Sequence, residues 1–182
     1  MKIEPLSIEG AFEISAPVHA DHRGEFSRFY CESTFSDHGL NTRWVQHNRS
    51  LTKVRGAVRG MHFQYPPHAE IKLVQCVSGA VFDVLVDLRA HSRSFGQWLA
   101  VTLDSSRHNA VYIPRGVAHG FQALTDDARL IYLHSSAYAP QAEGGVRHDD
   151  PDLDIAWPLP VVEVSQKDLA LPSLSRIQPV EL

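Results

Sequence analysis

The side chains that could move protons at neutral pH stand in a few short segments of this chain. His62 lies within Arg59–Gln64 (RGMHFQ), a segment that would otherwise be largely apolar between its polar ends. A neutral imidazole can accept a proton near pH 7. Tyr132 lies in a second segment, and a phenol in a cavity can donate a proton while it stays un-ionised at rest. A core histidine and a buried structural tyrosine are the alternatives, and Tyr138 is a rival donor.

The segment Pro114–Phe121 (PRGVAHGF) predicts an imidazole delivered to the inside of a barrel. Its proline and glycine make a tight turn, and the strand that follows carries His119 inward. The segment resembles the second motif of the cupin superfamily, but Gln64 stands where the first cupin motif has its second histidine. A metal site built on His62, Glu70 and His119 is the alternative. Because a neutral amide is a poor replacement for imidazole on a transition metal, we expect no metal and no other cofactor.

Short alternation of apolar and polar residues dominates the chain and predicts an all-β fold, a β-sandwich or barrel with a few short helices. Over Phe82–Leu88 the even-numbered residues fall on one face and the odd-numbered residues on the other. In the same way Leu130, Tyr132 and His134 share one face. The predicted strand segments are Arg59–Gln64, Lys72–Val77, Phe82–Leu88, Gln97–Leu103, Ala110–Ile113, Gly120–Leu124 and Arg129–His134.

Helical signal is confined to two short stretches, Glu32–His38 and Ser165–Ala170, where Ser165 could cap the first turn. No linker, repeat or low-complexity tract divides the chain. We therefore expect a single domain over residues 1–182, with its core at about 20–172 and a loose tail over Ser173–Leu182.

Composition excludes several classes of protein. The net charge is −4 and no basic run is dense enough to act as a footprint for nucleic acid or anionic lipid. The apolar runs are far shorter than the roughly 20 residues of a membrane helix, and the start lacks a signal-peptide stretch. Cys31 and Cys76 lie too far apart in sequence, and without a CxxC partner, to indicate a disulfide scaffold or a thiolate zinc site, so both are predicted to be core residues. A cytoplasmic protein that binds neither nucleic acid nor membrane is expected.

An ordered set of segments over residues 20–172 resembles the dTDP-4-dehydrorhamnose 3,5-epimerase family, nucleotide-sugar epimerases of the cupin superfamily. The resemblance implies a cupin-type jelly roll with a metal-free site. It also implies a homodimer in which the amino-terminal strand of one subunit contributes to its partner's pocket. The segments are Arg59–Gln64, Lys72–Val74, Phe82–Val84, Asp87–Arg89, Phe95–Trp98, Ile113–Phe121, Tyr132, Tyr138–Pro140 and Lys167–Asp168.

Epimerisation of such a sugar needs three kinds of side chain. A ketone at C4 acidifies the hydrogens at C3 and C5, so one base removes a proton, a second group holds the enolate and an acid returns the proton on the opposite face. By resemblance, His62 is the base and Asp168 is the carboxylate behind it, which would stabilise the imidazolium. Tyr132 matches the proton donor of the family.

Cationic and N–H groups are the candidates for holding the substrate's oxygens. Lys72 and His119 could stabilise the oxyanion at C4. An ion pair with Glu70 on the strand surface is the alternative for Lys72. Arg59 and Arg23 suit a diphosphate, because a guanidinium meets phosphate oxygens bidentately.

Further substrate contacts follow from the resemblance alone. Gln46 and Asn48 match amide-bearing contacts on the nucleotide side, and Phe26 matches an aromatic contact. One departure concerns Arg28, which stands where the family motif has glutamate and so reverses a charge beside the expected nucleotide pocket. Arg28 therefore leaves the identity of the base open. The remaining candidates are Tyr138, Glu143 and Lys167.

The function predicted from the sequence is epimerisation of a nucleotide-diphospho-4-keto-6-deoxy sugar, of the dTDP-4-dehydro-6-deoxyglucose type, in deoxysugar or surface-polysaccharide synthesis. The alternatives are a metal-dependent cupin such as a dioxygenase or isomerase, a mono-epimerase of another nucleotide sugar, and a sugar-nucleotide binding module without turnover. The sequence leaves open whether C3, C5 or both are inverted.

Overall fold

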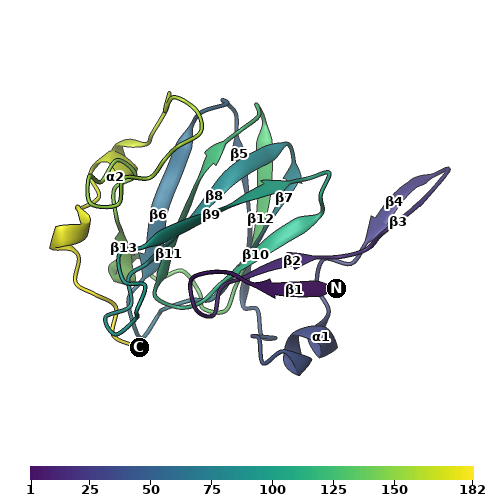
Figure 1. The fold of residues 1–182 in the computed structure, drawn as a ribbon, viewed down its shortest axis with the longest axis horizontal. Coiled ribbons are helices and arrows are strands. Elements are labelled where there is room, and N and C mark those ends of the chain that lie inside the picture. The colour runs from purple at the N-terminus through teal and green to yellow at the C-terminus, as the bar shows by residue number, and fades with distance from the viewer.

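The computed structural model describes residues 1–182 and consists of two antiparallel β-sheets packed face to face (Figure 1). One sheet has six strands in the order β1-β2-β10-β7-β12-β5, and the other has five in the order β13-β6-β11-β8-β9. The predicted all-β jelly-roll sandwich is thus confirmed. The elements are β1 (Lys2–Pro5), β2 (Phe12–Ser15), β3 (Val18–Asp21), β4 (Gly24–Ser27), α1 (Glu32–Asp37), β5 (Gln46–Thr52), β6 (Val58–Gln64), β7 (Lys72–Ser78), β8 (Ala80–Asp87), β9 (Trp98–Asp104), β10 (Asn109–Ile113), β11 (Val117–Ala123), β12 (Ala128–His134), β13 (Glu143–Gly145) and α2 (Gln166–Leu169), with short 3-10 turns at Pro140–Ala142 and Leu174–Arg176.

The main hydrophobic core fills the space between the two sheets. Val74 and Leu130 enter it from the six-stranded sheet, and Leu85 and Phe121 enter it from the five-stranded sheet. Burial of these side chains supplies the largest favourable contribution to folding. Tyr132 packs at the margin of this core, on the face it shares with Leu130. The core therefore fixes the walls on which the candidate side chains stand.

The C-terminal residues cover the outer face of the five-stranded sheet, so the prediction of a loose tail over Ser173–Leu182 is wrong. Ile177 and Val180 are buried in a second hydrophobic cluster with residues of β6 and β8. The Val180 amide also donates to the Leu88 carbonyl at 2.8 Å, and the Ala90 amide donates to the Val180 carbonyl at 3.0 Å. Because the outer face of β8 carries the apolar side chains of Phe82, Val84 and Val86, it needs this cover.

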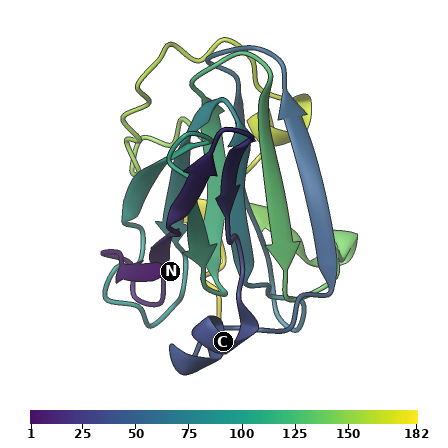
Figure 2. The same cartoon turned by 90° about the vertical axis from the view of Figure 1, so that its right-hand side faces the viewer.

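Each predicted strand segment corresponds to one of the strands β6 to β12, and both predicted helices are present. Ser165 caps α2 as predicted, since its Oγ accepts a hydrogen bond from the Asp168 amide at 3.1 Å. The strand β5 was not predicted because it is an edge strand of polar sequence, paired only with β12 (Figure 2). Cys76 is buried, but Cys31 lies half-exposed before α1, so its assignment to the core is wrong.

Strands β3 and β4 form a hairpin that projects from the body of the molecule (Figure 1). We name residues 18–28, which hold this hairpin, the β-arm. Its two strands pair only with each other. At its base His108 contacts Ser27 Oγ through Nδ1 at 3.1 Å and Glu25 through Nε2 at 3.0 Å. Because a two-stranded hairpin is marginally stable in water, the β-arm needs a further surface to pack against.

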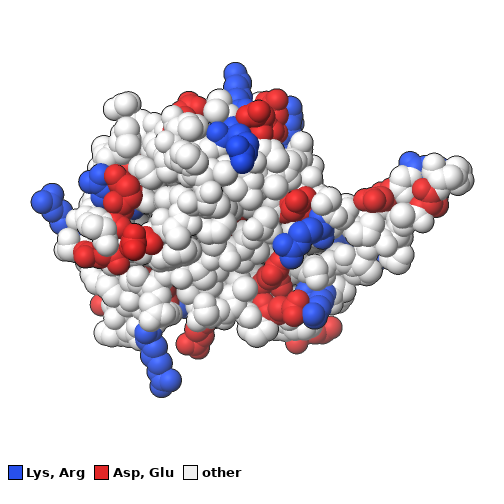
Figure 3. Space-filling view, turned by 45° about the horizontal axis from the view of Figure 1, so that its top comes forward, with Lys and Arg blue, Asp and Glu red and all other residues white.

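The face shown in Figure 3 carries small groups of both charges separated by uncharged surface. That distribution agrees with a composition of 17 Lys and Arg against 21 Asp and Glu. No helix of the chain has the length and apolar character needed to cross a bilayer.

Candidate active site

A cavity of about 1020 Å³ opens between the two sheets. Strands β6 and β11 form one wall, β5, β7 and β12 form the other, and β13 and α2 contribute further residues. Every candidate site residue outside the β-arm lines this cavity. These residues are Gln46, Asn48, Arg59, His62, Lys72, His119, Tyr132, Tyr138, Glu143, Lys167 and Asp168.

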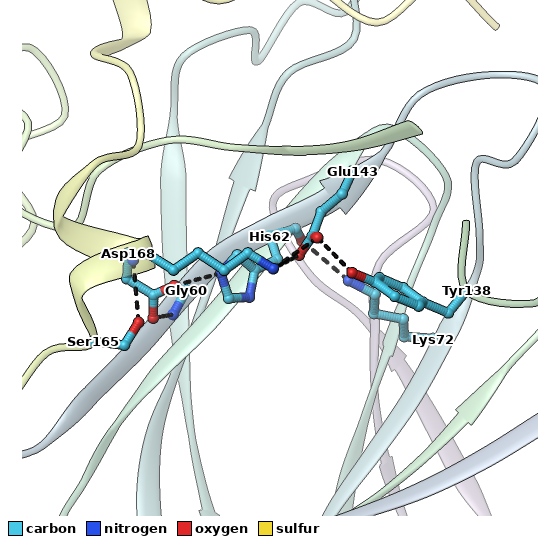
Figure 4. A network of polar contacts seen from close by, with 8 residues as sticks. Gly60, His62, Lys72, Tyr138, Glu143, Ser165 and Asp168 are labelled. Atoms are coloured by element: carbon cyan, nitrogen blue, oxygen red, sulfur yellow. Dashed lines mark hydrogen bonds and ion pairs between the residues drawn. The ribbon is translucent and has the colours of Figure 1, made fainter. Parts of the chain in front are cut away.

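His62 and Asp168 form a hydrogen-bonded pair on the wall made by β6. The Nε2–H of His62 donates to Asp168 Oδ1 at 2.7 Å, and the Gly60 amide donates to the other carboxylate oxygen at 3.1 Å (Figure 4). Burial opposes ionisation of Asp168, but these hydrogen bonds outweigh it and hold its pKa below the ordinary value. An ionised Asp168 accepts from Nε2, so it leaves Nδ1 of His62 as the free proton acceptor.

The position of His62 depends on a close approach of β6 to β11. Gly60 has a φ of +104°, and a Cβ there would lie 2.7 Å from the Gly120 Cα and from the His119 carbonyl oxygen. Only glycine fits this position without strain. The next strand of the sheet therefore lies close enough to place His119 directly opposite His62 in the register.

His119 forms a second imidazole–carboxylate pair, with Asp83 of β8 behind it. The two groups are 2.8 Å apart and both are buried, and the second oxygen of Asp83 has no hydrogen-bond partner. Burial raises the pKa of Asp83, and the nearby His119 and Lys72 offset this only in part. The role of Asp83 was missed from the sequence, although a carboxylate in the middle of an apolar strand was the available signal.

Lys72 contributes a buried cation to the cavity. Its Nζ lies 3.0 Å from Glu70 Oε1 and donates to the His62 carbonyl oxygen at 3.0 Å. The ion pair expected as the alternative reading of Lys72 is therefore present, but it is buried and lines the cavity instead of lying on the strand surface. Burial acts to raise the pKa of Glu70. The charge and hydrogen bond of Lys72 lower it by more, so the pKa lies below its ordinary value.

Tyr132 stands on β12, in the wall opposite His62. Its hydroxyl lies 2.9 Å from Ser50 Oγ, and its ring meets the ring of His119 edge-on, with centroids 6.2 Å apart. Burial raises the phenol pKa well above its usual value, and the hydrogen bond with Ser50 offsets this only in part. The hydroxyl is therefore protonated at neutral pH and available as an acid.

The hydroxyl of Tyr138, the rival donor, is bonded to Glu143, on the side of His62 away from Asp168 (Figure 4). Its hydroxyl donates to Glu143 Oε2 at 2.7 Å, and Lys167 Nζ donates to both oxygens of that carboxylate at 2.7 Å. Its side chain is also more than half exposed. The Tyr138 proton is thus already bonded to a carboxylate, whereas Tyr132 faces the cavity from the wall opposite the base.

Two amides and one guanidinium lie along β5 and β6. Gln46 Nε2 donates to Asn48 Oδ1 at 3.3 Å. Arg59 donates through Nε to Thr52 Oγ1 at 3.0 Å and through Nη2 to the Leu51 carbonyl at 3.1 Å. The remaining N–H groups of Arg59 are free for an anionic ligand.

Gln64, which replaces the second cupin histidine, uses its side-chain amide for hydrogen bonds with backbone groups. Its Oε1 accepts from the Ala139 amide at 2.6 Å, and its Nε2 donates to the His68 carbonyl at 3.0 Å. The three alternative metal ligands, His62, Glu70 and His119, are each bonded to another charged group. No three His, Cys, Asp or Glu side chains converge in a geometry that could hold a metal ion.

The candidates on the β-arm do not reach the cavity of their own chain. Arg23 is bonded to Asp21 with its side chain 78% exposed, and Phe26 is 68% exposed. Arg28 is exposed as well. Within one chain, the structure therefore does not bring Arg23, Phe26 and Arg28 together with the other site residues.

Three further residues of the site were not identified from the sequence as functional. Ser50 contacts the Tyr132 hydroxyl, and Ser165 orients the helix turn that carries Asp168. His134 lines the cavity beside Tyr132. Its position on the same strand face was predicted, but nothing in the sequence indicated what it contacts.

A jelly roll with an imidazole–carboxylate pair and a protonated phenol on opposite walls of one cavity defines an acid–base enzyme of the cupin type. Residues 5–176 match the family model described as dTDP-4-dehydrorhamnose 3,5-epimerase. The chain belongs to the dTDP-4-dehydrorhamnose 3,5-epimerase family and is an enzyme of the isomerase class.

Similar proteins of known name support this assignment over nearly the whole chain. The chain is 44% identical to a dTDP-4-dehydrorhamnose 3-epimerase of Streptomyces niveus, over 92% of this chain and 81% of that protein. It is 41% identical to a dTDP-4-dehydrorhamnose 3,5-epimerase of Methanothermobacter thermautotrophicus, over 89% and 88%. The solved structure of NovW, a 4-keto-6-deoxy sugar epimerase from the novobiocin gene cluster of Streptomyces spheroides, superposes with a TM-score of 0.93 at 43% identity, over 96% of this chain and 88% of that one.

Proposed function

We propose that this enzyme epimerises a nucleoside diphosphate-linked 4-keto-6-deoxy sugar at C3, at C5 or at both, in a route to deoxysugars. The observation that carries the proposal is the placement of His62 and Tyr132. His62 comes from the five-stranded sheet and Tyr132 from the six-stranded sheet, so they face the cavity from opposite sides. A base and an acid on opposite sides of a sugar ring are what inversion of a carbon centre requires.

Each step can be assigned to residues of the cavity. Nδ1 of His62 takes the proton, and ionised Asp168 stabilises the imidazolium that forms. The Lys72 ammonium stabilises the negative charge that develops on the C4 oxygen, and His119, on the opposite wall of the cavity, is the second candidate for that role. The phenol of Tyr132 then returns a proton to the opposite face.

The names of the similar proteins do not decide which carbon is inverted, since 3-epimerases and 3,5-epimerases both occur at similar identity. Proton NMR of the 4-keto sugar nucleotide in deuterated buffer reports deuterium uptake and inversion at each carbon separately. Uptake of deuterium at C3 or C5 with appearance of the epimer is the expected result. A substrate that binds and keeps both protons would leave a binding module as the function.

We expect activity to survive chelation. The three alternative metal ligands, His62, Glu70 and His119, are already bonded to Asp168, Lys72 and Asp83 respectively. The Gln64 side chain accepts a hydrogen bond from the Ala139 amide. Protein dialysed against EDTA should therefore keep its full epimerisation rate, with less than one equivalent of metal by elemental analysis. Loss of activity that one divalent ion restores would instead favour the metal-dependent cupin function.

We also propose a homodimer in which the β-arm of each subunit reaches the cavity of its partner. The β-arm projects from the body, carries the exposed Phe26 and lacks a third strand (Figure 1). Arg23 and Arg28 would then supply charge to a nucleotide diphosphate bound in the partner's cavity. Because Arg28 offers only donors, it suits a phosphate or an acceptor edge of the base, and a thymidine nucleotide is the working assignment. We place the reaction in the cytoplasm, because a charged nucleotide sugar does not cross a membrane unaided.

Mixed dimers test the exchange of arms. His62→Ala and the double variant Arg23→Ala/Phe26→Ala should each be nearly inactive alone, because one lacks the base and the other lacks the arm contacts. Mixing equal amounts after subunit exchange should restore roughly a quarter of the wild-type activity, since half of the dimers contain one complete site. No recovery, with heterodimers verified by mass, would show that the β-arm serves its own chain.

A further inference from the structure

His134 occupies a place beside the proposed proton donor that the mechanism above does not use. It lies two residues beyond Tyr132 on the same face of β12 and lines the same cavity. The two rings are stacked, with centroids 6.2 Å apart and planes inclined by 25°. On its other side Tyr132 meets His119 edge-on at 6.2 Å. The phenol ring is thus held between two imidazoles.

A chain of amides connects His134 to the segment that carries the second tyrosine. Asn48 Nδ2 donates to His134 Nε2 at 3.3 Å, and Asn48 Oδ1 accepts from Gln46 at 3.3 Å. The Oε1 of Gln46 in turn accepts from the Tyr138 amide at 2.9 Å. Of the two expected nucleotide-side amides, Asn48 is therefore bonded to the ring that stacks on Tyr132, and Gln46 is bonded to Asn48.

The surroundings of His134 keep it neutral. Burial lowers its pKa to about 4, and the positive charge of Lys72 acts in the same direction. Glu70 offsets this in part, while His119 and His47 add to the lowering. A neutral ring with its proton on Nδ1 can accept the amide hydrogen bond at Nε2, whereas a protonated ring could not. His134 is therefore an acceptor and a packing surface, not a proton donor at neutral pH.

We propose that His134 is a positioning residue, which fixes the ring of Tyr132 by stacking and links its orientation to the Gln46–Asn48 pair. The inference rests on the proposed epimerase reaction. Proton return requires the phenol to be aimed at one carbon, and a misplacement of about 1 Å at a reacting group can cost 10²-fold in rate. Abstraction of the proton by His62 does not depend on that aim. Loss of His134 therefore impairs inversion more than deuterium uptake.

The test compares His134→Leu with the wild type in deuterated buffer. We expect the ratio of inversion to deuterium uptake to fall about tenfold to hundredfold, while the KM changes little. His134→Phe, which keeps the stacked ring, should recover most of that ratio. His47→Leu is the control, because it alters the neighbouring strand β5 at an exposed side chain. An unchanged ratio in His134→Leu, or an equal fall of uptake and inversion, would overturn the positioning role.

A measurement on the free enzyme separates this inference from the proposed function. Long-range proton–nitrogen NMR of the imidazoles should show His134 with its proton on Nδ1 and neutral at pH 6, and Asn48→Ala should move the Nε2 resonance. A proton on Nε2 would contradict the hydrogen bond from Asn48. If the free-enzyme spectra agree but the wild type shows neither uptake nor inversion, the proposed reaction fails and the positioning role of His134 in that reaction fails with it.

Discussion

His62→Ala should abolish deuterium uptake at C3 and C5 together, with a loss of at least about 10²–10⁴-fold. The reason is that one imidazole serves whichever carbon is presented to it, and the two other candidate groups His119 and Glu70 already have charged partners. His119 is bonded to Asp83, and Glu70 is bonded to Lys72. The measurement is proton NMR of the 4-keto sugar nucleotide in deuterated buffer, with the thermal unfolding midpoint recorded to verify folding.

Asp168→Asn serves as the matched variant for the same pair. It keeps the shape of the side chain but removes the charge that stabilises the imidazolium and favours the tautomer with a free Nδ1. We expect a loss between that of His62→Ala and the wild type. Wild-type turnover by His62→Ala would remove the assignment of the base, and an unaffected Asp168→Asn would show that the pair is structural.

Much of the wall structure of the site could be predicted, because the strands β6 to β12 follow the alternation rule closely. Tyr132 stands on the cavity side of β12 for the same reason that Leu130 stands in the core two residues earlier. The polar residues Arg59 and Gln64 at the ends of an otherwise apolar segment argued against a core histidine at His62, and the resemblance to the family supplied its role as the base. Local pattern is informative wherever one face of a strand is buried and the other is not.

Other features of the fold and the site could not be predicted, because they depend on contacts between segments that are distant in sequence. The partner of His119 is Asp83, which lies on another strand 36 positions earlier in the chain. Strand β5 is polar because one face lines the cavity and the other is exposed at the sheet edge, so it lacked an apolar signal. The tail over Ser173–Leu182 has only two buried anchors, Ile177 and Val180, too few to distinguish it from a mobile end by composition.

Tyr132→Phe should separate the two halves of the reaction. The variant removes only the hydroxyl and its contact with Ser50, so the ring still packs at the margin of the core. His62 can then remove a proton and return deuterium to the same face, which gives uptake without inversion. We expect inversion to fall at least about 10²-fold, while deuterium uptake stays within about tenfold of the wild type. Because burial holds the Tyr132 pKa above its usual value of about 10, the wild-type ratio of inversion to uptake should stay constant up to about pH 9.

Tyr138→Phe is the control that distinguishes the two candidate donors. It removes the hydrogen bond to Glu143 but leaves the ion pair of Glu143 with Lys167, so the mouth of the cavity keeps its charges. Inversion and uptake should then change together and by less than in Tyr132→Phe. If Tyr138→Phe instead gives uptake without inversion while Tyr132→Phe inverts normally, the two tyrosines exchange roles. The exposed phenol would then have to leave Glu143 during turnover, and the raised pKa of the buried one would serve packing alone.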